Sequence, residues 1–406
     1  MSVDVRPCAS TEELADALGV ISQYFGMEGS VEGAERFLNW IELDRMHGAW
    51  DGDRIVGGAG AFSFDVSVPG GNRVPAAGVT VIGVQPTDRR RGVLTAMMRA
   101  QLDDVHRRGE PLAYLWASEA TIYGRFGYGF ASLNASITLP TEKATFAQPF
   151  EARGQARFVT LNEALDLFPP LYERVRDLRP GMPSRTHAWW ETRRLSDDPA
   201  RRRPGQGPMK MAVLDLDGAP AGYVAYRISP GIVGGITTAK VIVVEVIAPT
   251  PEAERELWSF VFNLDWKAAV ECEFLPVDNA LLLTVANPRH LKQTLTDALW
   301  VRLVDVGEAL KARALMDASP IVLEIEDAFC PWNAGRWKVA PGQAERTDEE
   351  ADLCLDVSAL GSVYLGGFSF SDLVRGLRVT ELRPGAAVKA DALFRTDARP
   401  WCPEIF

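Results

Sequence analysis

The strongest constraint on the fold is the stretch from residue 79 to residue 105. The β-branched run at 79–84 is typical of a strand, and Pro86 interrupts it. A helix is expected next, because apolar side chains recur every three or four residues at Leu94, Met97, Met98, Leu102 and Val105. Three arginines at 89–91, and then Gly92, lie where this helix opens. A helix start offers unpaired N–H groups and the positive end of its dipole, so the arrangement predicts a pyrophosphate site.

The spacing Arg-x-x-Gly-x-apolar after the strand resembles the acetyl-coenzyme A (acetyl-CoA) loop of the GNAT acyltransferases. The alternative is an ordinary helix start with a solvated basic tip. A second apolar strand at 112–117 and the run 118–130 behind it favour the first interpretation. In GNAT folds these two strands splay apart, and the pantetheine arm of the coenzyme lies between them and pairs with exposed strand edges.

Composition limits the classes of protein that remain. A chain of 406 residues exceeds one ordinary core, so two or three domains are expected. The formal net charge of −11, without a large basic cluster, disfavours nucleic-acid binding and favours cationic substrates. No apolar run is long enough to span a membrane and the first residues do not resemble an export signal, so we expect a cytoplasmic protein. The five cysteines and four histidines are widely spaced, which predicts neither a disulfide framework nor a metal site.

The middle of the chain repeats part of the first pattern. In the first segment, a turn at 51–53 joins two expected strands ahead of the arginine loop, and a strand at 137–140 is expected to close the domain. Later, an Asp-Gly hairpin at 211–226 precedes a strand at 240–247, a proline break and a helix. Where the first copy has arginines, the second has carboxylates that would repel a pyrophosphate, at Glu252, Glu254 and Glu256. We infer a duplicated GNAT-like fold whose second copy lacks the coenzyme loop; the alternative is two unrelated α/β units with similar turns.

The last segment has a different character. A helix is expected at 308–315, followed by strands at 321–327, 336–339 and 352–360. This order resembles the sterol-carrier-protein-like domain, which could bind a lipid or serve only as a scaffold. The predicted fold class is thus α/β (α+β), with tandem GNAT-like domains at 1–150 and 151–300 and a sterol-carrier-protein-like domain at 301–406.

Three features together resemble the Eis (enhanced intracellular survival) acetyltransferases: the order of the segments, the run Tyr-Gly-Arg-Phe-Gly-Tyr-Gly at 123–129, and a chain that ends in Phe406. The resemblance implies Tyr123 as general acid and the free carboxylate of Phe406, supplied by the C-terminal domain, as general base. It implies acetyl-CoA as co-substrate, with no metal, bound by the residues that match the coenzyme site of the family: Ile82, Gly83, Val84, Arg90, Arg91, Gly92, Val93, Leu94, Thr95, Ser118 and Glu119. It further implies N-acetylation of aminoglycosides or of lysine side chains, and a homohexamer.

Physical chemistry accommodates both catalytic roles. Acetyl transfer to an amine needs a base for the ammonium proton and an acid for the departing thiolate. A tyrosine phenol, with an ordinary pKa of about 10, can donate to a thiolate of similar basicity. The alternative for Tyr123 is a core aromatic whose hydroxyl satisfies a backbone group. A terminal carboxylate has an ordinary pKa of about 3.5 and must be desolvated to act as a base, which the apolar Phe406 side chain would favour; the alternative is a disordered tail.

The acceptor side is less well defined by the sequence. Glu28, Glu32 and Glu35 lie in the early helical region that roofs the acceptor site of GNAT folds and could bind ammonium groups; solvated surface carboxylates are the alternative. Glu404 is a further candidate for contact with the substrate. The leading hypothesis is an acetyl-CoA-dependent amine N-acetyltransferase. The alternatives are a lipid- or ligand-binding protein with a vestigial acetyltransferase site, and a protein-lysine acetyltransferase.

Overall fold

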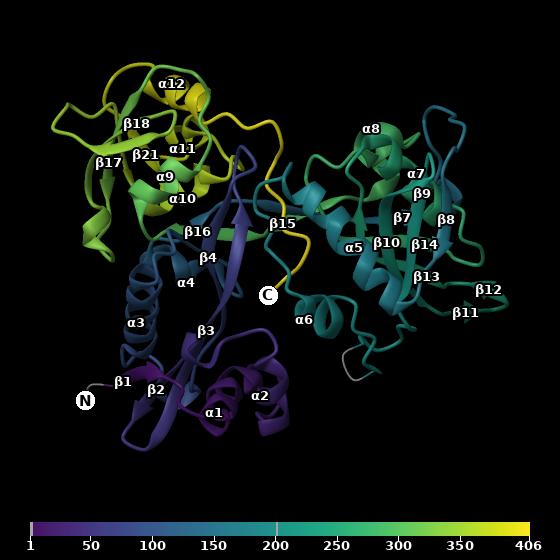
Figure 1. Cartoon of the computed structure of the whole chain (residues 1–406), viewed down its shortest axis with the longest axis horizontal. Helices are drawn as coiled ribbons and strands as arrows, with labels where there is room; N and C mark the ends of the chain where they lie inside the picture. The colour runs from purple at the N-terminus through teal and green to yellow at the C-terminus, as the bar shows by residue number, and fades with distance from the viewer. Residues whose placement is uncertain (1–2, 200–201) are drawn as a thin grey trace. The chain divides into compact units, whose positions relative to one another are not determined.

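A computed structural model describes residues 3–199 and 202–406 of the chain (Figure 1). The chain divides into two compact units. Unit 1 consists of Met1–Ser132, Ala298–Asp397 and Ile405–Phe406. Unit 2 consists of Leu133–Asp297 and Ala398–Glu404.

The first sheet of unit 1 has seven strands in the order β1-β2-β3-β4-β5-β16-β6. Their bounds are β1 Asp4–Pro7, β2 Met46–Asp51, β3 Arg54–Ser67, β4 Arg73–Val84, β5 Leu112–Trp116, β16 Leu299–Leu303 and β6 Gly129–Phe130. The predicted hairpin around residues 51–53 is confirmed, because β2 and β3 pair antiparallel across that turn. Strands β4 and β5 pair in parallel, whereas β16 pairs antiparallel with both β5 and β6.

Helices cover both faces of this sheet, and two neighbouring glycines of β3 let them approach closely. A Cβ atom at Gly58 would lie 2.6 Å from the carbonyl oxygen of Ala17 in α1 (Thr11–Ser22). One at Gly57 would lie 2.8 Å from the sulfur of Met97 in α3 (Val93–Arg107). Figure 1 shows α3 on one side of β3, with α1 and α2 (Val31–Phe37) on the other. The predicted arginine loop therefore opens a helix that packs directly on the sheet.

The C-terminal part of unit 1 forms a five-stranded sheet in the order β19-β18-β17-β20-β21. Its strands are β17 Ile321–Glu326, β18 Gly335–Ala340, β19 Gln343–Arg346, β20 Leu353–Asp356 and β21 Val379–Glu381, with helices α9 Val306–Ala312, α10 Val357–Tyr364, α11 Phe370–Arg375 and α12 Ala386–Leu393. The strand expected at 352–360 is wrong beyond Asp356. The Asp356 carboxylate accepts the N–H of Ala359 at 2.9 Å and so caps α10, which makes residues 357–360 helical.

Unit 2 also contains a seven-stranded sheet, in the order β15-β7-β14-β13-β10-β9-β8. Its strands are β7 Leu133–Pro140, β8 Gln155–Phe158, β9 Lys210–Leu216, β10 Ala219–Ser229, β13 Lys240–Ile247, β14 Ala269–Leu275 and β15 Thr294–Asp297. The expectation that the strand at 137–140 closes the first domain is wrong, because β7 pairs with β14 and β15 in this second sheet. The chain leaves the first sheet after β6 and returns to it with β16.

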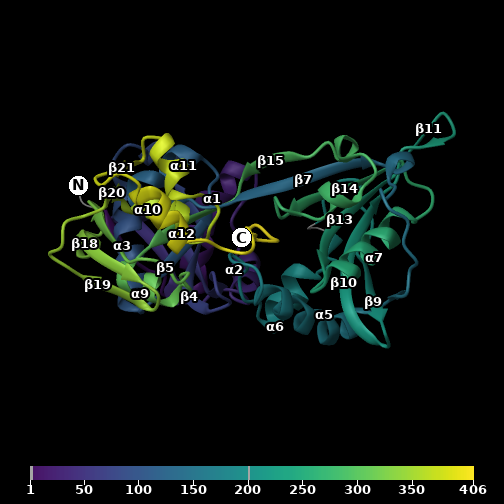
Figure 2. The ribbon, with the colours of Figure 1, turned by 90° about the horizontal axis from the view of Figure 1, so that it is seen from above.

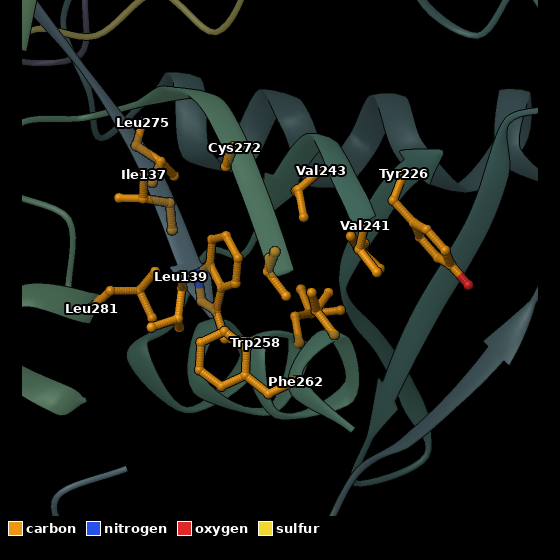
Figure 3. Packing of buried hydrophobic residues seen from close by; sticks show 14 of the residues in the cluster. Ile137, Leu139, Tyr226, Val241, Val243, Trp258, Phe262, Cys272, Leu275 and Leu281 are labelled. Atoms are coloured by element: carbon orange, nitrogen blue, oxygen red, sulfur yellow. The ribbon is translucent and has the colours of Figure 1, made fainter. Parts of the chain in front are cut away.

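The two faces of this second sheet bury different side chains. Helix α7 (Pro251–Phe262) brings Trp258 and Phe262 against apolar residues of β7, β13 and β14 (Figure 3). Helix α5 (Leu161–Arg176) packs Phe168 flat on the Tyr223 ring at 3.8 Å, on the other face. Figure 2 shows both helices beside the strands of this unit.

The shorter elements are α4 Ala120–Tyr123, α6 His187–Trp189, α8 Leu281–Thr284, β11 Ile232–Val233 and β12 Ile236–Thr237. No helix in the described ranges is long and apolar enough to cross a membrane.

A buried ion cluster in unit 2 holds Glu404, close to the end of the chain. The Arg185 guanidinium donates to Glu245 at 2.7 and 3.1 Å and to Glu404 at 2.6 Å. Arg194 lies 2.9 Å from Glu245, and the hydroxyl of Tyr223 donates to the same carboxylate at 2.6 Å. The second oxygen of Glu404 accepts the indole N–H of Trp189 at 2.9 Å. Both carboxylate oxygens of Glu404 are therefore engaged inside the protein.

This cluster predicts acid sensitivity. Burial alone would raise the pKa of Glu245, but Arg185 and Arg194 outweigh it and lower the pKa to about 2. The carboxylate therefore stabilises the fold above its unfolded pKa of about 4.3, and that stabilisation is lost as the pH falls toward 2. At neutral pH we expect Glu245→Gln to lower the free energy of unfolding by about 3 kcal/mol, because Arg185 and Arg194 lose their shared anion. Urea unfolding followed by tryptophan fluorescence measures both effects.

Glu271→Gln is the matched control for this prediction, because Glu271 pairs with Lys240 at 2.7 Å in a partly exposed position of the same sheet. Such a pair contributes less than about 1 kcal/mol. Equal losses in the two variants would contradict the assigned role of the buried cluster.

Candidate active site

Strands β4 and β5 form a fork. They pair in parallel at three positions only, and the last pair is Gly78 with Tyr114. Beyond this pair β5 stays bonded to β16, whereas β4 continues through residues 79–84 and no strand of the described chain pairs with its β5 side. The edge of β4 beyond Gly78 therefore presents backbone N–H and C=O groups toward the gap, which is the splaying expected from the sequence.

A β-bulge changes the direction of this edge of β4. Gly58 of β3 pairs with Gly83 and Gly60 pairs with Thr80, so β4 carries one extra residue between these pairs. Val81 adopts a φ of 46°, which is rare for a β-branched side chain. Such strained residues cost about 1–3 kcal/mol and cluster at functional sites, as bulges do. Ile82, Gly83 and Val84 follow directly; the hydroxyl of Tyr24 donates to the carbonyl oxygen of Val84 at 2.6 Å.

The side chains of the arginine loop have different partners. Arg91 pairs with Asp51 at 2.8 Å and also with Asp88. Arg54 donates two bonds to Asp88, at 2.8 and 2.9 Å, and is the main cause of the lowered pKa of that carboxyl. Within the described ranges, Arg89 and Arg90 are exposed and form neither a hydrogen bond nor an ion pair. Arg91 therefore holds the arginine loop in place, whereas Arg89 and Arg90 are available to bind an anion.

The start of α3 is open to a ligand. Gly92 occupies the N-cap with a φ of 83°, and no side chain caps the helix. Gly92 is exposed, and among the described residues a Cβ atom there would meet nothing within 4 Å, so a ligand can approach the backbone closely. Among the described residues, no side chain therefore accepts the first-turn N–H groups at Val93, Leu94 and Thr95.

The N-terminus of the corresponding helix in unit 2 is capped by a side chain and carries carboxylates, so it does not offer free amides to an anion. The hydroxyl of Thr250 caps α7 by accepting the N–H of Ala253 at 3.3 Å, and Glu252 and Glu254 occupy its first turn. The carboxylate of Glu256 accepts the backbone N–H groups of residues 153 and 154 at 3.0 and 2.7 Å. Carboxylates and a cap thus fill the place where α3 presents free amides.

Tyr123 ends the one-turn helix α4 and is 6% exposed. Its ring packs in a core cluster with residues of α3 and meets Tyr128 edge-on, with ring centroids 6.0 Å apart. Burial raises the pKa of its hydroxyl, and a hydrogen bond with Ser118 partly offsets this. The hydroxyl is thus brought to Ser118, while the neighbouring Glu119 accepts a bond from Thr121 at 3.0 Å.

Phe406 lies at the fork. Its ring makes edge-on contacts with Tyr114 at 5.0 Å and Phe64 at 5.3 Å between centroids. A Cβ atom at Gly78 would lie 3.4 Å from the same ring. Gly78 and Tyr114 are the last pair before the strands diverge, so the final residue of the chain sits where the gap opens.

Phe406 and Tyr123 approach this gap from opposite faces of the sheet. The cluster around Tyr123 includes Val79 and Leu115, whereas Phe406 contacts their neighbours Gly78 and Tyr114. Successive strand residues point to opposite faces. The fork is thus a place where groups from the two faces can meet.

The sequence did not single out Gly78, Tyr114 or Phe64, which form the floor beneath Phe406. A signal was present, because a glycine inside a strand often marks a close approach by another group. By contrast, Glu28, Glu32 and Glu35 are all exposed, as solvated carboxylates are. In the described part of the chain, no three His, Cys, Asp or Glu residues are grouped so as to hold a metal ion.

Comparison with known proteins agrees with this geometry. Residues 4–131 and 181–303 each match an Acetyltransferase (GNAT) domain family, and residues 306–403 match the Sterol carrier protein domain family. A protein of Streptomyces avermitilis named Uncharacterized N-acetyltransferase is 41% identical over 95% of both chains. N-acetyltransferase Eis of Mycobacterium tuberculosis is 32% identical over 86% of this chain and 85% of its own. The crystal structure of Eis1 from Mycobacterium abscessus has a TM-score of 0.86 at 35% identity, covering 99% of this chain and 100% of that one.

The chain belongs to the Eis family of GNAT N-acetyltransferases. The predicted fold class is confirmed, with two GNAT domains followed by a sterol-carrier-like domain. As a GNAT enzyme, this Eis-family protein uses acetyl-CoA. The residues present fit that co-substrate, because the exposed Gly92, the uncapped amides of α3 and two arginines with no partner among the described residues meet at the start of the helix.

This fit yields a prediction for coenzyme binding in the Eis-family enzyme. Arg90→Ala removes an exposed cation with no internal partner in the described chain, so we expect an unchanged melting temperature and a KM for acetyl-CoA about tenfold higher. Steady-state kinetics at low ionic strength measure the effect, which salt should weaken. Arg289→Ala, an exposed arginine of unit 2, is the matched control and should leave KM unchanged. An unaltered KM in Arg90→Ala would contradict the assignment.

Proposed function

We propose that this enzyme transfers the acetyl group of acetyl-CoA directly to an amine of a cationic substrate, with Tyr123 as general acid and the carboxylate of Phe406 as general base. The observation that carries the proposal is the Phe406 ring at the fork between β4 and β5, on the opposite face from the cluster of Tyr123. A terminal residue lodged there would bring its main-chain carboxylate toward the gap.

Residues on either side of the fork would bind the co-substrate. The edge of Ile82, Gly83 and Val84 would pair with the amides of the pantetheine arm, and Ser118 and Glu119 would border the same gap. The residues for the pyrophosphate are those of the loop and helix start: Arg90, Arg91, Gly92, Val93, Leu94 and Thr95. Arg91 contributes through its ion pairs with Asp51 and Asp88, which hold the loop in place. The bound co-substrate supplies an activated acetyl group as a thioester.

Proton transfers follow from the two catalytic groups. The raised pKa keeps Tyr123 protonated at neutral pH, so its hydroxyl can donate a proton to the leaving sulfur. The carboxylate of Phe406 accepts the ammonium proton, directly or through one water, so that the neutral amine can form the C–N bond. The C–S bond then breaks as Tyr123 protonates the sulfur, and the proton lost by the acetylated nitrogen returns to the Tyr123 oxygen through water. The rings of Phe62, Phe64 and Tyr114 pack against Phe406 and hold the residue that carries this carboxylate.

The acceptors we propose are aminoglycosides or lysine side chains of peptides and proteins, since both present ammonium groups to a chain with a net charge of −11. A thiol-release assay with acetyl-CoA and a panel of aminoglycosides, polyamines and lysine peptides tests this. Amine-dependent release of thiol supports the proposal, and the preferred amine separates antibiotic from protein acetylation. No release with any amine favours the alternative, a lipid- or ligand-binding protein with a vestigial site.

The homohexamer implied by the family resemblance is part of the proposal. Light scattering on purified protein should then give six times the 44.5 kDa of one chain. A smaller mass would contradict that part alone.

A further inference from the structure

One loop of the sterol-carrier-like domain packs against the GNAT domain behind the candidate site. This brace loop, residues 327–333, joins β17 to β18 and belongs to unit 1, as the GNAT sheet does. Its side chains contact α3, the turn that follows Tyr123, and the region that follows β16.

Phe329 contacts two elements of the candidate site at once. The guanidinium of Arg99 in α3 lies 3.8 Å above its ring, and Arg99 also donates to the Phe329 carbonyl oxygen. The ring of Phe126 meets Phe329 edge-on, with centroids 5.1 Å apart at 73°. Phe126 lies only three residues after Tyr123, in the 3-10 turn Gly124–Phe126. A single ring of the C-terminal domain thus contacts both α3 and the turn that directly follows the proposed acid.

A buried ion pair packs against Gly127, at the end of the same turn. Arg302 of β16 donates to Asp327 of the brace loop at 2.6 Å, and both side chains are fully buried. Asp327 also accepts the N–H of Cys330 at 2.9 Å and the amide of Asn333 at 3.0 Å, so the carboxylate fixes the loop as well as the arginine. A Cβ atom at Gly127 would lie 2.8 Å from the Arg302 guanidinium. The backbone of the turn therefore rests directly on a group that the brace loop holds.

Trp332 anchors the other end of the loop, on α3 and on the segment after β16. It stacks on His106 in the last turn of α3, with centroids 4.5 Å apart, and its indole donates to the carbonyl oxygen of Val304 at 2.8 Å. Both side chains border the core cluster around Tyr123, but in the described ring contacts Phe329 meets Phe126, in the turn after Tyr123, whereas Trp332 meets His106.

The helix that carries Tyr123 needs such support. Helix α4 has four residues and no side-chain cap, so it cannot hold its own geometry and depends on packing. A displacement of about 1 Å at a catalytic group costs on the order of a hundredfold in rate. We propose that Phe329 is a positioning residue for Tyr123, so that the sterol-carrier-like domain takes part in catalysis through its brace loop. This inference rests on the function proposed above for Tyr123.

Hydrogen exchange tests the packing without any activity. In Phe329→Ala we expect the backbone amides of residues 118–128 to exchange at least about tenfold faster than in the wild type, and in Trp332→Ala to exchange at the wild-type rate. Unchanged exchange in Phe329→Ala, or equal acceleration in both variants, would overturn the proposal. If the wild type transfers no acetyl group, the proposed function fails while this comparison still reports on the brace. Should Phe329→Ala not fold, Phe329→Val gives the same comparison.

Kinetics distinguish positioning from general stability. At a temperature where all variants are folded, Phe329→Ala should lower kcat about tenfold and leave the KM for acetyl-CoA within about twofold. Phe329→Leu, which keeps most of the apolar contact with Phe126, should restore kcat to within about threefold of the wild type. Trp332→Ala should retain the wild-type kcat. Loss of kcat to the same extent in Phe329→Ala and Trp332→Ala would mean that the loop only stabilises the fold.

Discussion

Adding one glycine after Phe406 is expected to lower kcat about a thousandfold, because general base catalysis of this kind contributes about 10²–10⁴ in rate. The extension keeps the aromatic ring but converts its carboxylate into an amide, so the ammonium proton loses its acceptor. The dissociation constant for acetyl-CoA should stay within about twofold, since the arginine loop and the start of α3 are untouched. Steady-state kinetics and calorimetry together measure the two quantities.

Two further variants separate the carboxylate from the ring. Phe406→Leu keeps a terminal carboxylate on an apolar side chain and should retain most of the activity. Deletion of Phe406 moves the carboxylate one residue back, away from the floor of Phe64 and Tyr114, and should be as inactive as the extension. Full turnover in either the extended or the shortened chain rules out the terminal carboxylate as the base.

Tyr123→Phe is expected to lower kcat about a hundredfold with unchanged acetyl-CoA binding, because the leaving sulfur loses its proton donor. The pH profile gives a second readout. Burial raises the pKa of Tyr123, and an acid works only while protonated, so the activity of the wild type should persist above the ordinary pKa of tyrosine, about 10, and decline only beyond it. Tyr123→Phe should lose this alkaline decline. Rates measured between about pH 7 and 11 test both statements.

Tyr128→Phe is the matched control. Its hydroxyl is buried in the same cluster and has no hydrogen-bond partner in the described part of the chain, so its removal should leave kcat within about threefold. A loss in Tyr128→Phe as large as in Tyr123→Phe would show that any change in this cluster disturbs the rate, and would remove the case for Tyr123 as the acid.

Local patterns predicted the parts of the fold that depend on neighbouring residues. The strand at 79–84, the helix after it and the hairpin at 51–53 follow from side-chain period and turn chemistry, and all three are present. The sheet membership of β7 and β16 was not predicted, because it depends on pairing between segments far apart in the chain. The end of the strand at Asp356 was predictable from the sequence, since an aspartate before a helical run is a common N-cap.

The candidate site shows the same division. The sequence predicted an anion site at residues 89–95, because arginines, a glycine and a helix start are adjacent there. It did not predict that Arg91 holds the arginine loop in place while Arg89 stays unpaired in the described structure. The reason is that Asp51 approaches Arg91 only in the folded sheet. The brace loop was equally hidden, since Phe329 meets Arg99 and Phe126 from positions about 200 residues further along the chain.

A crystal structure with acetyl-CoA bound tests the central claim most directly. The account predicts the pyrophosphate on Arg90 and the first-turn amides of α3, and the thioester in the fork between β4 and β5. It further predicts the sulfur within about 3.5 Å of the Tyr123 hydroxyl and the Phe406 carboxylate within reach of the acetyl carbon through an amine or one water. Coenzyme bound away from the fork, or a thioester that neither Tyr123 nor Phe406 approaches, would contradict it.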